Sequence, residues 1–562
     1  MLTNGKDFKD IQNFRSQVCI IGAGPAGISL ALKLAELKIG TILLESGDLE
    51  VRSEANDLNK GLVANGSAHE PLETYRYRTV GGASSHWGGR CIPFDPVDFQ
   101  EREHVADSGW PFPKKELDPY FREASKICEA GANLYTSTEA LAHKQEEIFP
   151  GFDSAYLNSK GLERWSPPTH FGKKYREDLE NSKEVELLYN LTCTHIQLDP
   201  DGAKVQFIEV KTSAGDKHFV QADIFILAAG CIENTRLLLS SWDVHPSGIG
   251  NMHDVVGRYY MAHISGITSK AKIHPRVLTS YIHNFEQDEE GIILRRRFAL
   301  SEKAQQEHQL LNIIGFFFRP ELADPTHQDA IFSLAHIKKQ GVGKFLLKEP
   351  LGKKIAHIRN IAASFPGLMD EVKEIQRQRN EARRLPYLIS SKQAPYQYFF
   401  YQSEQAPNPN SRISIDLRLR DALGMPRAVV DLRFSDLDFK TIKAFHKMMK
   451  ERFEELQLGE FYYEESELEK HLDQKLRNFD SGSHHMGSTR MSTDPKKGVV
   501  NKEGQVHGVR NLYVNGASTF PTGSHANPTL TIVAMALRLA DHLKSKCSEK
   551  LNLKYTSKAY FS

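Results

Sequence analysis

The sequence is poor in cysteine and has no long apolar run. Its six cysteines are scattered over 562 residues and form no C-x-x-C pair. This spacing excludes a zinc site built on cysteine pairs and argues against a disulfide framework. No segment is apolar for long enough to span a bilayer, and the start of the chain lacks the basic and apolar regions of a secretory signal. These absences predict a cytoplasmic protein with reduced thiols, no transmembrane segment and no bound metal.

The chain also lacks an excess of charge of either sign. Its 72 basic and 71 acidic residues give a formal net charge of +1. Binding to nucleic acid without sequence preference needs a basic surface, so nucleic acid is not an expected partner. Small molecules and other proteins remain as expected partners. The length predicts two domains.

A βαβ unit opens the chain. Residues 18–21 form an apolar run that suits a strand buried on both faces, residues 28–37 have helical apolar spacing, and residues 41–44 read as a second strand. Between the first strand and the helix lies the motif G-x-G-x-x-G, residues 22–27. In this context the motif predicts a dinucleotide site.

Each conspicuous residue of this unit has a physical role in such a site. Gly22 permits the tight turn, Gly24 lets the backbone approach a pyrophosphate, and Gly27 allows the helix to pack closely on the strand. Glu45 closes the second strand, where an acid binds the adenosine ribose. The carboxylate disfavours NADP, but the βαβ unit does not decide between FAD and NAD.

Related elements recur in the middle and at the end of the chain. Residues 225–230 and 512–514 read as buried strands, and a helix is expected from about residue 529 to residue 542. The sequence therefore predicts an α/β fold, in which a discontinuous Rossmann-like nucleotide-binding domain carries an inserted α+β substrate-binding domain. The first domain is assigned residues 1–100, 185–261 and 476–562, and the second is assigned residues 101–184 and 262–475.

Residues 338–393 are rich in Lys and Arg. The plain interpretation is a set of solvated helices. The alternative is a docking face for a membrane surface or for an electron-accepting partner.

Four further segments carry distinctive motifs: residues 80–89 (VGGASSHWGG), 228–235 (AAGCIENT), 484–491 (HHMGSTRM) and 516–531 (GASTFPTGSHANPTLT). They resemble, in order, motifs of the glucose–methanol–choline (GMC) flavoprotein family and span nearly the whole chain. Within that family the sequence is most similar to the branch that contains pyranose 2-oxidase and the FAD-dependent sugar dehydrogenases.

The resemblance implies FAD as the cofactor. One departure is Gly516, where many members carry Asp, so that only backbone N–H groups near Gly516 and Ala517 are left to serve the pyrophosphate. The implied cofactor-binding residues are Gly22, Gly24, Pro25, Ala26, Gly27, Glu45, Gly81, Gly82, Ser84, His86, Trp87, Cys193, Ala229, Gly230, Gly516, Ala517, Pro528 and Thr529.

The same resemblance implies a catalytic pair, His485 and Asn527. Alcohol oxidation moves a proton from oxygen and a hydride from carbon to flavin N5, and histidine has a suitable pKa for the proton. Asn527 would orient the substrate hydroxyl. His484 and His525 lie close to this pair in the sequence. A shift of one residue in the alignment with the family would exchange His485 for His484. Adjacent residues of a strand point to opposite faces, so His484 is interpreted as structural.

Two positions bear on how the flavin is held and reoxidised. His86 lies in an S-x-H-W setting through which some members attach FAD covalently; the alternative is a histidine packed beside Trp87. Gly88 stands where pyranose 2-oxidase-like proteins carry a threonine near flavin N5, which weakens the case for O₂ as acceptor. A quinone or a protein partner is the alternative acceptor.

The Asn527-Pro528-Thr529 segment is typical of a helix start, with Asn as N-cap and Pro in the first position. By resemblance, the positive end of that helix would face the flavin and stabilise its reduced form.

The branch resemblance favours a secondary hydroxyl of a sugar or glycoside as the reacting group. Alternating Tyr and Phe at residues 396–401 suit either a sugar-stacking strand or a plain sheet core. The rival functions are a GMC-fold lyase without net redox and a flavoprotein subunit of an electron-transfer complex.

Overall fold

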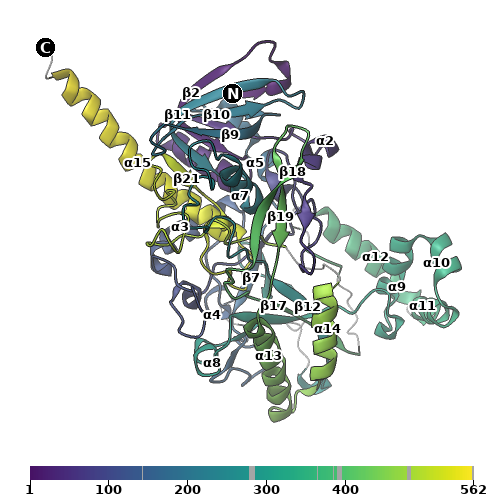
Figure 1. Ribbon diagram of the computed structural model, residues 1–562. Helices are drawn as coiled ribbons and strands as arrows, with labels where there is room; N and C mark the ends of the chain where they lie inside the picture. The colour runs from purple at the N-terminus through teal and green to yellow at the C-terminus, as the bar shows by residue number, and fades with distance from the viewer. Residues whose placement is uncertain are drawn as a thin grey trace.

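The computed structural model describes residues 1–559 apart from 142–143, 278–284, 364, 382, 384, 389–394 and 478–482. One end of the molecule is built on an eight-stranded sheet (Figure 1). Most of its strands are parallel, and an antiparallel meander forms one edge. In spatial order the strands are β1 (Leu2–Asn4), β8 (Val185–Tyr189), β3 (Thr41–Leu44), β2 (Asn13–Ile21), β11 (Lys217–Leu227), β10 (Val205–Lys211) and β9 (Thr192–Leu198), while β21 (Leu512–Val514) pairs with β11.

The strands predicted from apolar runs are present in this sheet. Residues 18–21 end β2, residues 41–44 are β3, and residues 512–514 are β21. The predicted strand at residues 225–230 ends earlier, at Leu227, because the chain turns there and Gly230 takes a left-handed φ of 86° before the next helix. The structure thus confirms the α/β prediction.

Helices cover this sheet and complete its core. Val18, Cys19 and Ile20 are fully buried, as a strand covered on both faces requires. Helices α1 and α15 pack together at the sheet, and α3 packs against α15. The bounds are α1 (Pro25–Glu36), α3 (Asp118–Ile127), α7 (Cys231–Ser240) and α15 (Thr529–Ala559), with shorter helices α2 (Ser53–Asn56), α4 (Ser137–Ala140), α5 (Phe171–Lys174) and α6 (Arg176–Asn181).

A six-stranded sheet forms the other end of the molecule, and α13 packs on it (Figure 1). Its core is rich in Phe, including the fully buried Phe298, Phe317 and Phe399. The strands are β20 (Gly459–Tyr462), β12 (Ile264–Ile273), β17 (Gln397–Ser403), β16 (Ile313–Phe318), β15 (Phe298–Leu300) and β6 (Leu157–Asn158). The helices at this end are α8 (Glu302–Glu307), α13 (Asp436–Glu455) and α14 (Glu465–Arg477).

Two smaller sheets connect segments that lie far apart in the sequence. One is formed by β13 (Glu286–Gln287), β14 (Ile293–Arg296), β7 (Leu162–Trp165) and β5 (Arg90–Cys91). The other is formed by β18 (Arg412–Arg420), β19 (Pro426–Asp431) and β4 (Leu62–Val63). Both sheets join segments that the sequence assigned to different domains, so the domain bounds stay a prediction.

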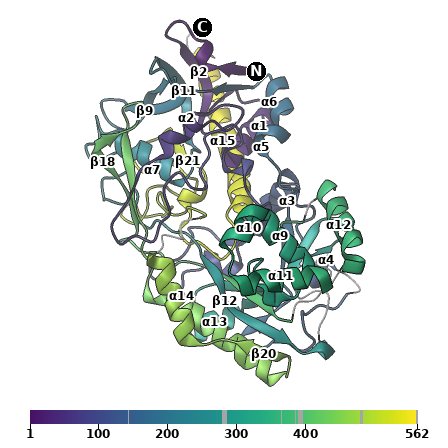
Figure 2. The same ribbon diagram turned by 90° about the vertical axis from the view of Figure 1, so that its right-hand side faces the viewer.

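Four helices protrude from the body (Figures 1 and 2). They are α9 (Ala330–Gln340), α10 (Val342–Lys348), α11 (Leu351–Ala363) and α12 (Phe365–Asn380). A small core of their own, with Ile331, Phe332 and Leu368, holds them together. They occupy much of the basic region that was predicted at residues 338–393; positions 364, 382, 384 and 389–393 of that region lie outside the described residues.

Among the described residues, none of the helices combines the length and the apolar character needed to cross a membrane.

Candidate active site

Three neighbouring parallel strands end at one edge of the eight-stranded sheet, and a glycine follows each of them. Strands β2, β11 and β21 lie side by side and lead to Gly24, Gly230 and Gly516. A methyl group built on any of these three glycines would meet no heavy atom within 4 Å. Open space at the carboxyl ends of parallel strands is where α/β sheets bind their ligands.

The other two glycines of the first turn are tightly packed. A Cβ on Gly22 would lie 2.6 Å from the carbonyl oxygen of Ala228, and one on Gly27 would lie 1.9 Å from that of Gly22. Gly24 caps α1, and Pro25 and Ala26 begin the helix, so the free N–H groups of its first turn adjoin the open space. The arrangement fits a pyrophosphate approaching at Gly24.

Glu45 lies just beyond β3, beside the same turn. Its carboxylate is buried and accepts hydrogen bonds from the backbone N–H groups of Ala23 (3.0 Å) and Gly47 (2.8 Å). Burial raises the pKa of this carboxyl. The ribose role proposed from the sequence is compatible with this position, since a carboxylate oxygen accepts more than one hydrogen bond.

The second motif packs directly on the first. The N–H of Gly81 donates to the carbonyl of Ala23 (2.7 Å), and a Cβ on Gly82 would lie 3.0 Å from Cα of Gly24. Gly82 begins a short 3-10 helix, η3 (Gly82–Ser85), whose Ser84 hydroxyl donates to the Gly81 carbonyl. The motif therefore stands over the open space at Gly24.

His86 ends η3 as an exposed side chain. Its ring stacks on Tyr77 with centroids 4.0 Å apart, and its Nδ1 lies 2.9 Å from the Ser85 hydroxyl. Trp87 turns the other way, since its indole N–H donates to the carbonyl of Thr169. The His86 ring thus stacks on Tyr77, whereas the alternative interpretation from the sequence placed it beside Trp87; the covalent attachment stays a prediction. Gly88 is exposed and has no neighbour within 4 Å of an added Cβ.

The last two motifs run side by side. The N–H groups of Gly487, Thr489 and Met491 donate to the carbonyls of Ala517, Ser518 and Thr519 at 2.8–3.0 Å. The third motif is tied in as well, because Asn234 accepts from the N–H of Ala229 and donates to the Ser518 hydroxyl. All four distant motifs therefore converge near the same sheet edge. Cys193 lies at the start of β9, where burial raises the pKa of its thiol to about 12, and its cofactor role stays a prediction.

The structure pairs His484, not His485, with Asn527. The amide nitrogen of Asn527 lies 3.2 Å from Nε2 of His484. The His485 ring faces elsewhere, stacking on His69 with centroids 5.5 Å apart. The contact to Asn527 thus comes from His484, and the catalytic role of the His485–Asn527 pair stays a prediction. The rings of His484 and His485 point in different directions, as the sequence predicted. His484, however, lies in a bend with a left-handed φ of 62°, and its ring is the one that faces Asn527.

A chain of hydrogen bonds sets the protons on His484. The Asn527 amide nitrogen only donates, so Nε2 of His484 accepts and carries a lone pair. Nδ1 of His484 then holds the proton and donates to Nδ1 of His263 (3.0 Å). At the far end, Nε2 of His263 donates to the carbonyl of Gly523 (3.3 Å). The bond from Asn527 at one end and the bond to Gly523 at the other require the same arrangement: both rings are neutral, with the proton on Nδ1 of His484 and on Nε2 of His263.

The other side of Asn527 is also fixed. Nε2 of Gln402, in β17, donates to Oδ1 of Asn527 (3.1 Å), and Arg90 donates to Oε1 of Gln402 (3.1 Å). These bonds determine which way both amides point. Arg90, His263 and Gln402 carry no motif in the sequence; the one signal is the amide of Gln402 directly after four consecutive aromatic residues of β17.

The pKa values agree with neutral imidazoles. Burial, reinforced by the charge of Arg90, lowers the pKa of His484 to about 4. Burial and the neighbouring His484 hold the pKa of His263 well below its usual range. An imidazole that is neutral at physiological pH and carries its lone pair at Nε2 is able to accept a proton there.

Charged and aromatic side chains surround this chain of bonds. Arg90 and Arg295 both pair with the fully buried Glu163. The guanidinium of Arg295 covers the ring of Phe316, which stacks on Phe400 with centroids 4.8 Å apart. This combination of aromatic faces and fixed polar groups suits a small polar molecule.

His525 belongs to a separate ionic cluster. It is fully buried between Asp95 (2.9 Å) and Arg297 (2.6 Å). Burial and Arg297 lower its pKa. It therefore does not share the Asn527 position.

Helix α15 begins at Thr529, and the first helical bond runs from Ile532 N–H to the Pro528 carbonyl. Asn527 thus precedes the cap, and its side chain bonds His484 and Gln402 instead of capping the helix as predicted. The helix still starts beside the catalytic candidates.

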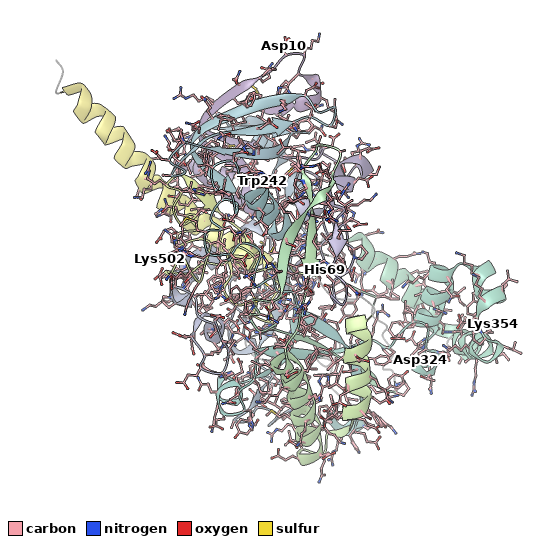
Figure 3. The ribbon with its side chains drawn as sticks, in the orientation of Figure 1. Asp10, His69, Trp242, Asp324, Lys354 and Lys502 are labelled. Atoms are coloured by element: carbon pink, nitrogen blue, oxygen red, sulfur yellow. The ribbon has the colours of Figure 1, made fainter. Side chains whose placement is uncertain are left out.

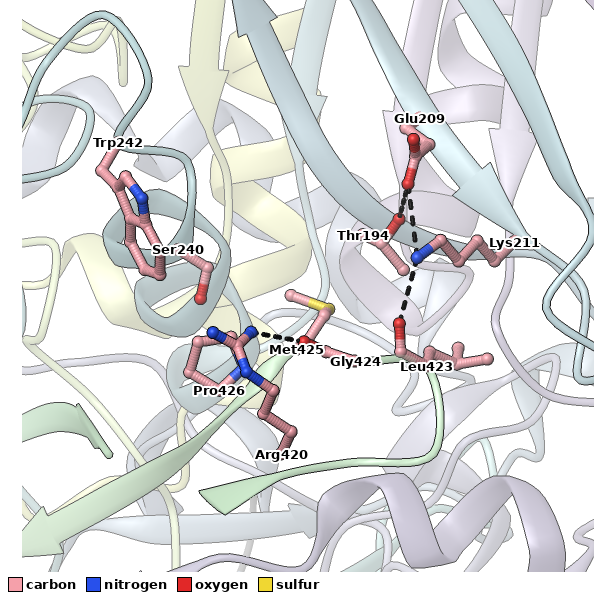
Figure 4. Close-up of a pocket in the computed structure, with 10 residues that line it drawn as sticks. All are labelled: Thr194, Glu209, Lys211, Ser240, Trp242, Arg420, Leu423, Gly424, Met425 and Pro426. Atoms are coloured by element: carbon pink, nitrogen blue, oxygen red, sulfur yellow. Dashed lines mark hydrogen bonds and ion pairs between the residues drawn. The ribbon is translucent and has the colours of Figure 1, made fainter. Parts of the chain in front are cut away.

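A cleft lies between the meander edge of the sheet and the turn joining β18 to β19 (Figure 4). Its polar groups bind one another: Glu209 accepts from Thr194, and Lys211 donates to the Leu423 carbonyl. None of the predicted catalytic residues or predicted cofactor-binding glycines lines this cleft, so it is separate from the candidate active site.

Comparison with known families now defines the class of protein. The sequence model described as FAD dependent oxidoreductase matches residues 17–311, which is more than half of the chain. FAD is therefore the cofactor, and the choice that the βαβ unit left open is resolved. A second model, described as GMC oxidoreductase, matches residues 407–536, which include His484 and Asn527. The chain belongs to the GMC oxidoreductase family, as its motifs predicted.

Individual relatives match nearly the full length. The 2-methyl-1,2-propanediol dehydrogenase of Mycolicibacterium austroafricanum is 24% identical over 96% of this chain and 97% of its own. The fructose dehydrogenase large subunit of Gluconobacter japonicus is 22% identical over 94% of this chain and 98% of its own. A crystal structure of formate oxidase shares the fold, with a TM-score of 0.52 and 16% identity over 96% of this chain and 100% of that chain. The protein is an FAD-dependent oxidoreductase, as predicted.

Proposed function

We propose that this enzyme oxidises a secondary hydroxyl of a sugar or glycoside, with His484 as the base that takes the hydroxyl proton. The observation that carries the proposal is a chain of hydrogen bonds that holds the Nε2 lone pair of His484 toward the amide of Asn527. The five side chains in it are Arg90, Gln402, Asn527, His484 and His263. FAD, when bound, supplies the acceptor for the hydride at flavin N5. His485, the base predicted from the sequence, is replaced in this role by its neighbour.

Asn527 has two tasks in this proposal. Its amide N–H fixes the His484 lone pair in the resting enzyme, and the same N–H donates to the substrate oxygen as that oxygen loses its proton. When His484 becomes an imidazolium, Nδ1 remains bonded to His263. The ring therefore gains a proton without changing orientation, which limits reorganisation during the reaction.

The proposed substrate class rests on the surroundings of this pair and on the relatives. The half-buried ring of Phe400, backed by Phe316, provides an apolar surface near Arg90 and Gln402, a combination suited to a sugar. The relatives named above act, by their names, on a diol and on fructose. For β17 the two interpretations of its aromatic residues combine: Phe399 and Tyr401 fill the core, and Phe400 faces the site.

The electron acceptor is proposed among O₂, a quinone and a protein. Gly88 leaves open space where a side chain would shape an oxygen pocket. The similarity to a protein named as a large subunit favours a second candidate role, the flavoprotein subunit of an electron-transfer complex. Slow turnover in O₂, restored by a quinone or a dye, would support that role.

The test is anaerobic reduction of the bound flavin. Sugars, glycosides and cyclic alcohols are added to the purified enzyme, and flavin absorbance is followed; we expect bleaching by one sugar class. His484→Ala should slow that bleaching by about 10²–10⁴-fold, as loss of a general base does. His485→Ala is the matched control and should bleach at a rate near that of the unmodified enzyme. Slow bleaching only in the His485 variant would return the role to that residue.

A further inference from the structure

The outer surface of the protruding helices carries aliphatic side chains that face solvent. We call the exposed side chains of α10 and α11 the α10–α11 face; they are Val342, Leu346, Leu347, Leu351, Ile355 and Ile358. Each exposes between 53% and 86% of its surface, with Leu347 the most exposed. Aliphatic exposure gathered on two consecutive helices marks a binding surface rather than scattered surface residues.

These side chains are not part of the core of the protrusion. On α11, Leu351, Ile355 and Ile358 are spaced by four and three residues and therefore share one helix face. His357 and Asn360, which are buried, point to the opposite side, where they bond Ser333 of α9. The helix thus has a complete inner face, and its apolar outer face is left for another contact.

The same helices concentrate positive charge. Residues 338–363 contain seven basic side chains and one acidic side chain, Glu349, although the whole chain has a net charge of only +1. Glu349 is engaged by His336. Within the described part of the chain, none of the seven forms an ion pair; they are Lys338, Lys339, Lys344, Lys348, Lys353, Lys354 and Arg359. Lys354 lies at the outer end of the protrusion (Figure 3).

Composition and shape indicate what covers this surface. Protein interfaces are enriched in aromatic residues, Met and Arg and are depleted in Lys. The α10–α11 face has the reverse composition, with Leu, Ile and Val bordered by Lys. It also stands on a protrusion and not in a groove (Figures 1 and 2), so it reaches a flat surface before the body does. Aliphatic side chains edged by lysines are typical of helices that lie in the interface of a bilayer with anionic headgroups.

We propose that the α10–α11 face binds the surface of an anionic phospholipid bilayer, with the aliphatic side chains among the acyl chains and the lysines on the headgroups. No described helix is able to cross a membrane, so the attachment is interfacial and reversible. The proposal is independent of the substrate and of the catalytic pair. It places a redox enzyme where membrane-soluble electron acceptors are found.

The experiment is co-sedimentation of the full-length enzyme with sucrose-loaded vesicles. Vesicles of phosphatidylcholine mixed with phosphatidylglycerol are compared with vesicles of phosphatidylcholine alone, at low and at high salt. We expect binding to the anionic vesicles, weakened about tenfold or more by high salt or by the absence of phosphatidylglycerol. Absence of binding to anionic vesicles at low salt would overturn the proposal.

Two variants and a matched control locate the surface. Leu347→Ser combined with Leu351→Ser removes apolar contact, and Lys344→Gln combined with Lys348→Gln removes charge; each should lower vesicle binding about tenfold or more. Met252→Ser combined with Leu417→Ser removes two other exposed apolar groups, outside the α10–α11 face, and should leave binding unchanged. Flavin content and bleaching rate should stay the same in all variants. Binding that survives both test variants would refute the assignment.

A fluorophore separates a bilayer from a second protein copy. The label is placed at Leu347→Cys in a Cys547→Ser background, since the other native cysteines are buried. Anionic vesicles should shift its emission to the blue, whereas a label at Leu417→Cys should not respond. A blue shift that rises with protein concentration in the absence of lipid, together with a dimer in sedimentation, would show self-association and overturn the proposal.

Discussion

The protonation of His484 is set by a few neighbouring atoms. Asn527 occupies its Nε2 lone pair and His263 accepts from its Nδ1, while burial and Arg90 keep the ring neutral. Each of these groups acts on the free energy of the imidazolium form. The activity should therefore depend on pH in a way that reports this one ring.

The first prediction concerns that pH dependence. The pKa of His484 is lowered to about 4, and only the neutral ring accepts a proton. Flavin reduction should therefore be constant between about pH 5 and pH 8 and fall as the pH drops through about 4. The measurement is the single-turnover rate of flavin reduction at low substrate concentration. A midpoint near 6.5 would mean that the ring is solvated like an ordinary histidine.

The second prediction concerns Gly24. Its φ is −80° and a Cβ there meets no protein atom, so Gly24→Ala should fold without strain. If the open space receives the pyrophosphate, the methyl group should cost about 1–3 kcal/mol of FAD binding, as overpacking does. Flavin content after purification and the FAD titration of stripped enzyme measure the loss. Gly343→Ala, which also adds a methyl group to open space, is the control and should retain full flavin.

At the scale of elements, strand β17 serves the core with one face and the site with the other. Phe399 and Tyr401 pack beneath α13, while Phe400 and Gln402 point toward the catalytic pair. This follows from the two-residue period of a strand. Substitutions at adjacent positions of β17 should therefore have separate effects on stability and on rate.

The third prediction uses that alternation. Phe399→Ala should lower stability by about 3–5 kcal/mol, the usual result of emptying a large core site, and leave the rate of flavin reduction nearly unchanged. Gln402→Leu should cost less stability, about 1–3 kcal/mol for the buried partners left unpaired, and slow reduction about tenfold to a hundredfold, because Asn527 loses its orientation. Thermal unfolding and single-turnover rates are measured on both variants. Equal effects on both quantities in both variants would contradict the division of faces.

The sequence predicted the elements whose signals are local and missed the contacts that are not. The apolar runs at residues 18–21 and 41–44 predict buried strands. The spacing of the glycines at residues 22–27 predicts a dinucleotide ligand. Gln402, Arg90 and His263 come together only through the fold, over separations of more than a hundred residues. The contact between His484 and Asn527 comes with a left-handed φ at His484, which no apolar pattern encodes.

At the scale of the whole molecule, the proposed cofactor site joins distant parts of the chain. Its glycines follow β2, β11 and β21, and η3 adds the segment around Ser84. A ligand that touches all of them binds only the assembled fold. FAD binding should therefore stabilise the eight-stranded sheet and the segments packed on it as one unit.

The last prediction tests this linkage and the attachment of the flavin together. His86 is exposed and ends η3, the short helix whose first residue Gly82 packs on Gly24. We therefore expect it to hold FAD covalently, so that acid-precipitated enzyme stays yellow and His86→Ala releases its flavin. The His86→Ala protein then gives a reversible system. FAD at a hundredfold excess over its dissociation constant should stabilise it by about 2.7 kcal/mol, seen as a higher thermal midpoint. Adding Gly24→Ala should reduce that gain at the same FAD concentration, because the variant binds more weakly. Release of the flavin from the unmodified enzyme by acid would show that His86 does not form the bond. A thermal midpoint that does not change when FAD is added would show that the four motifs do not form one site.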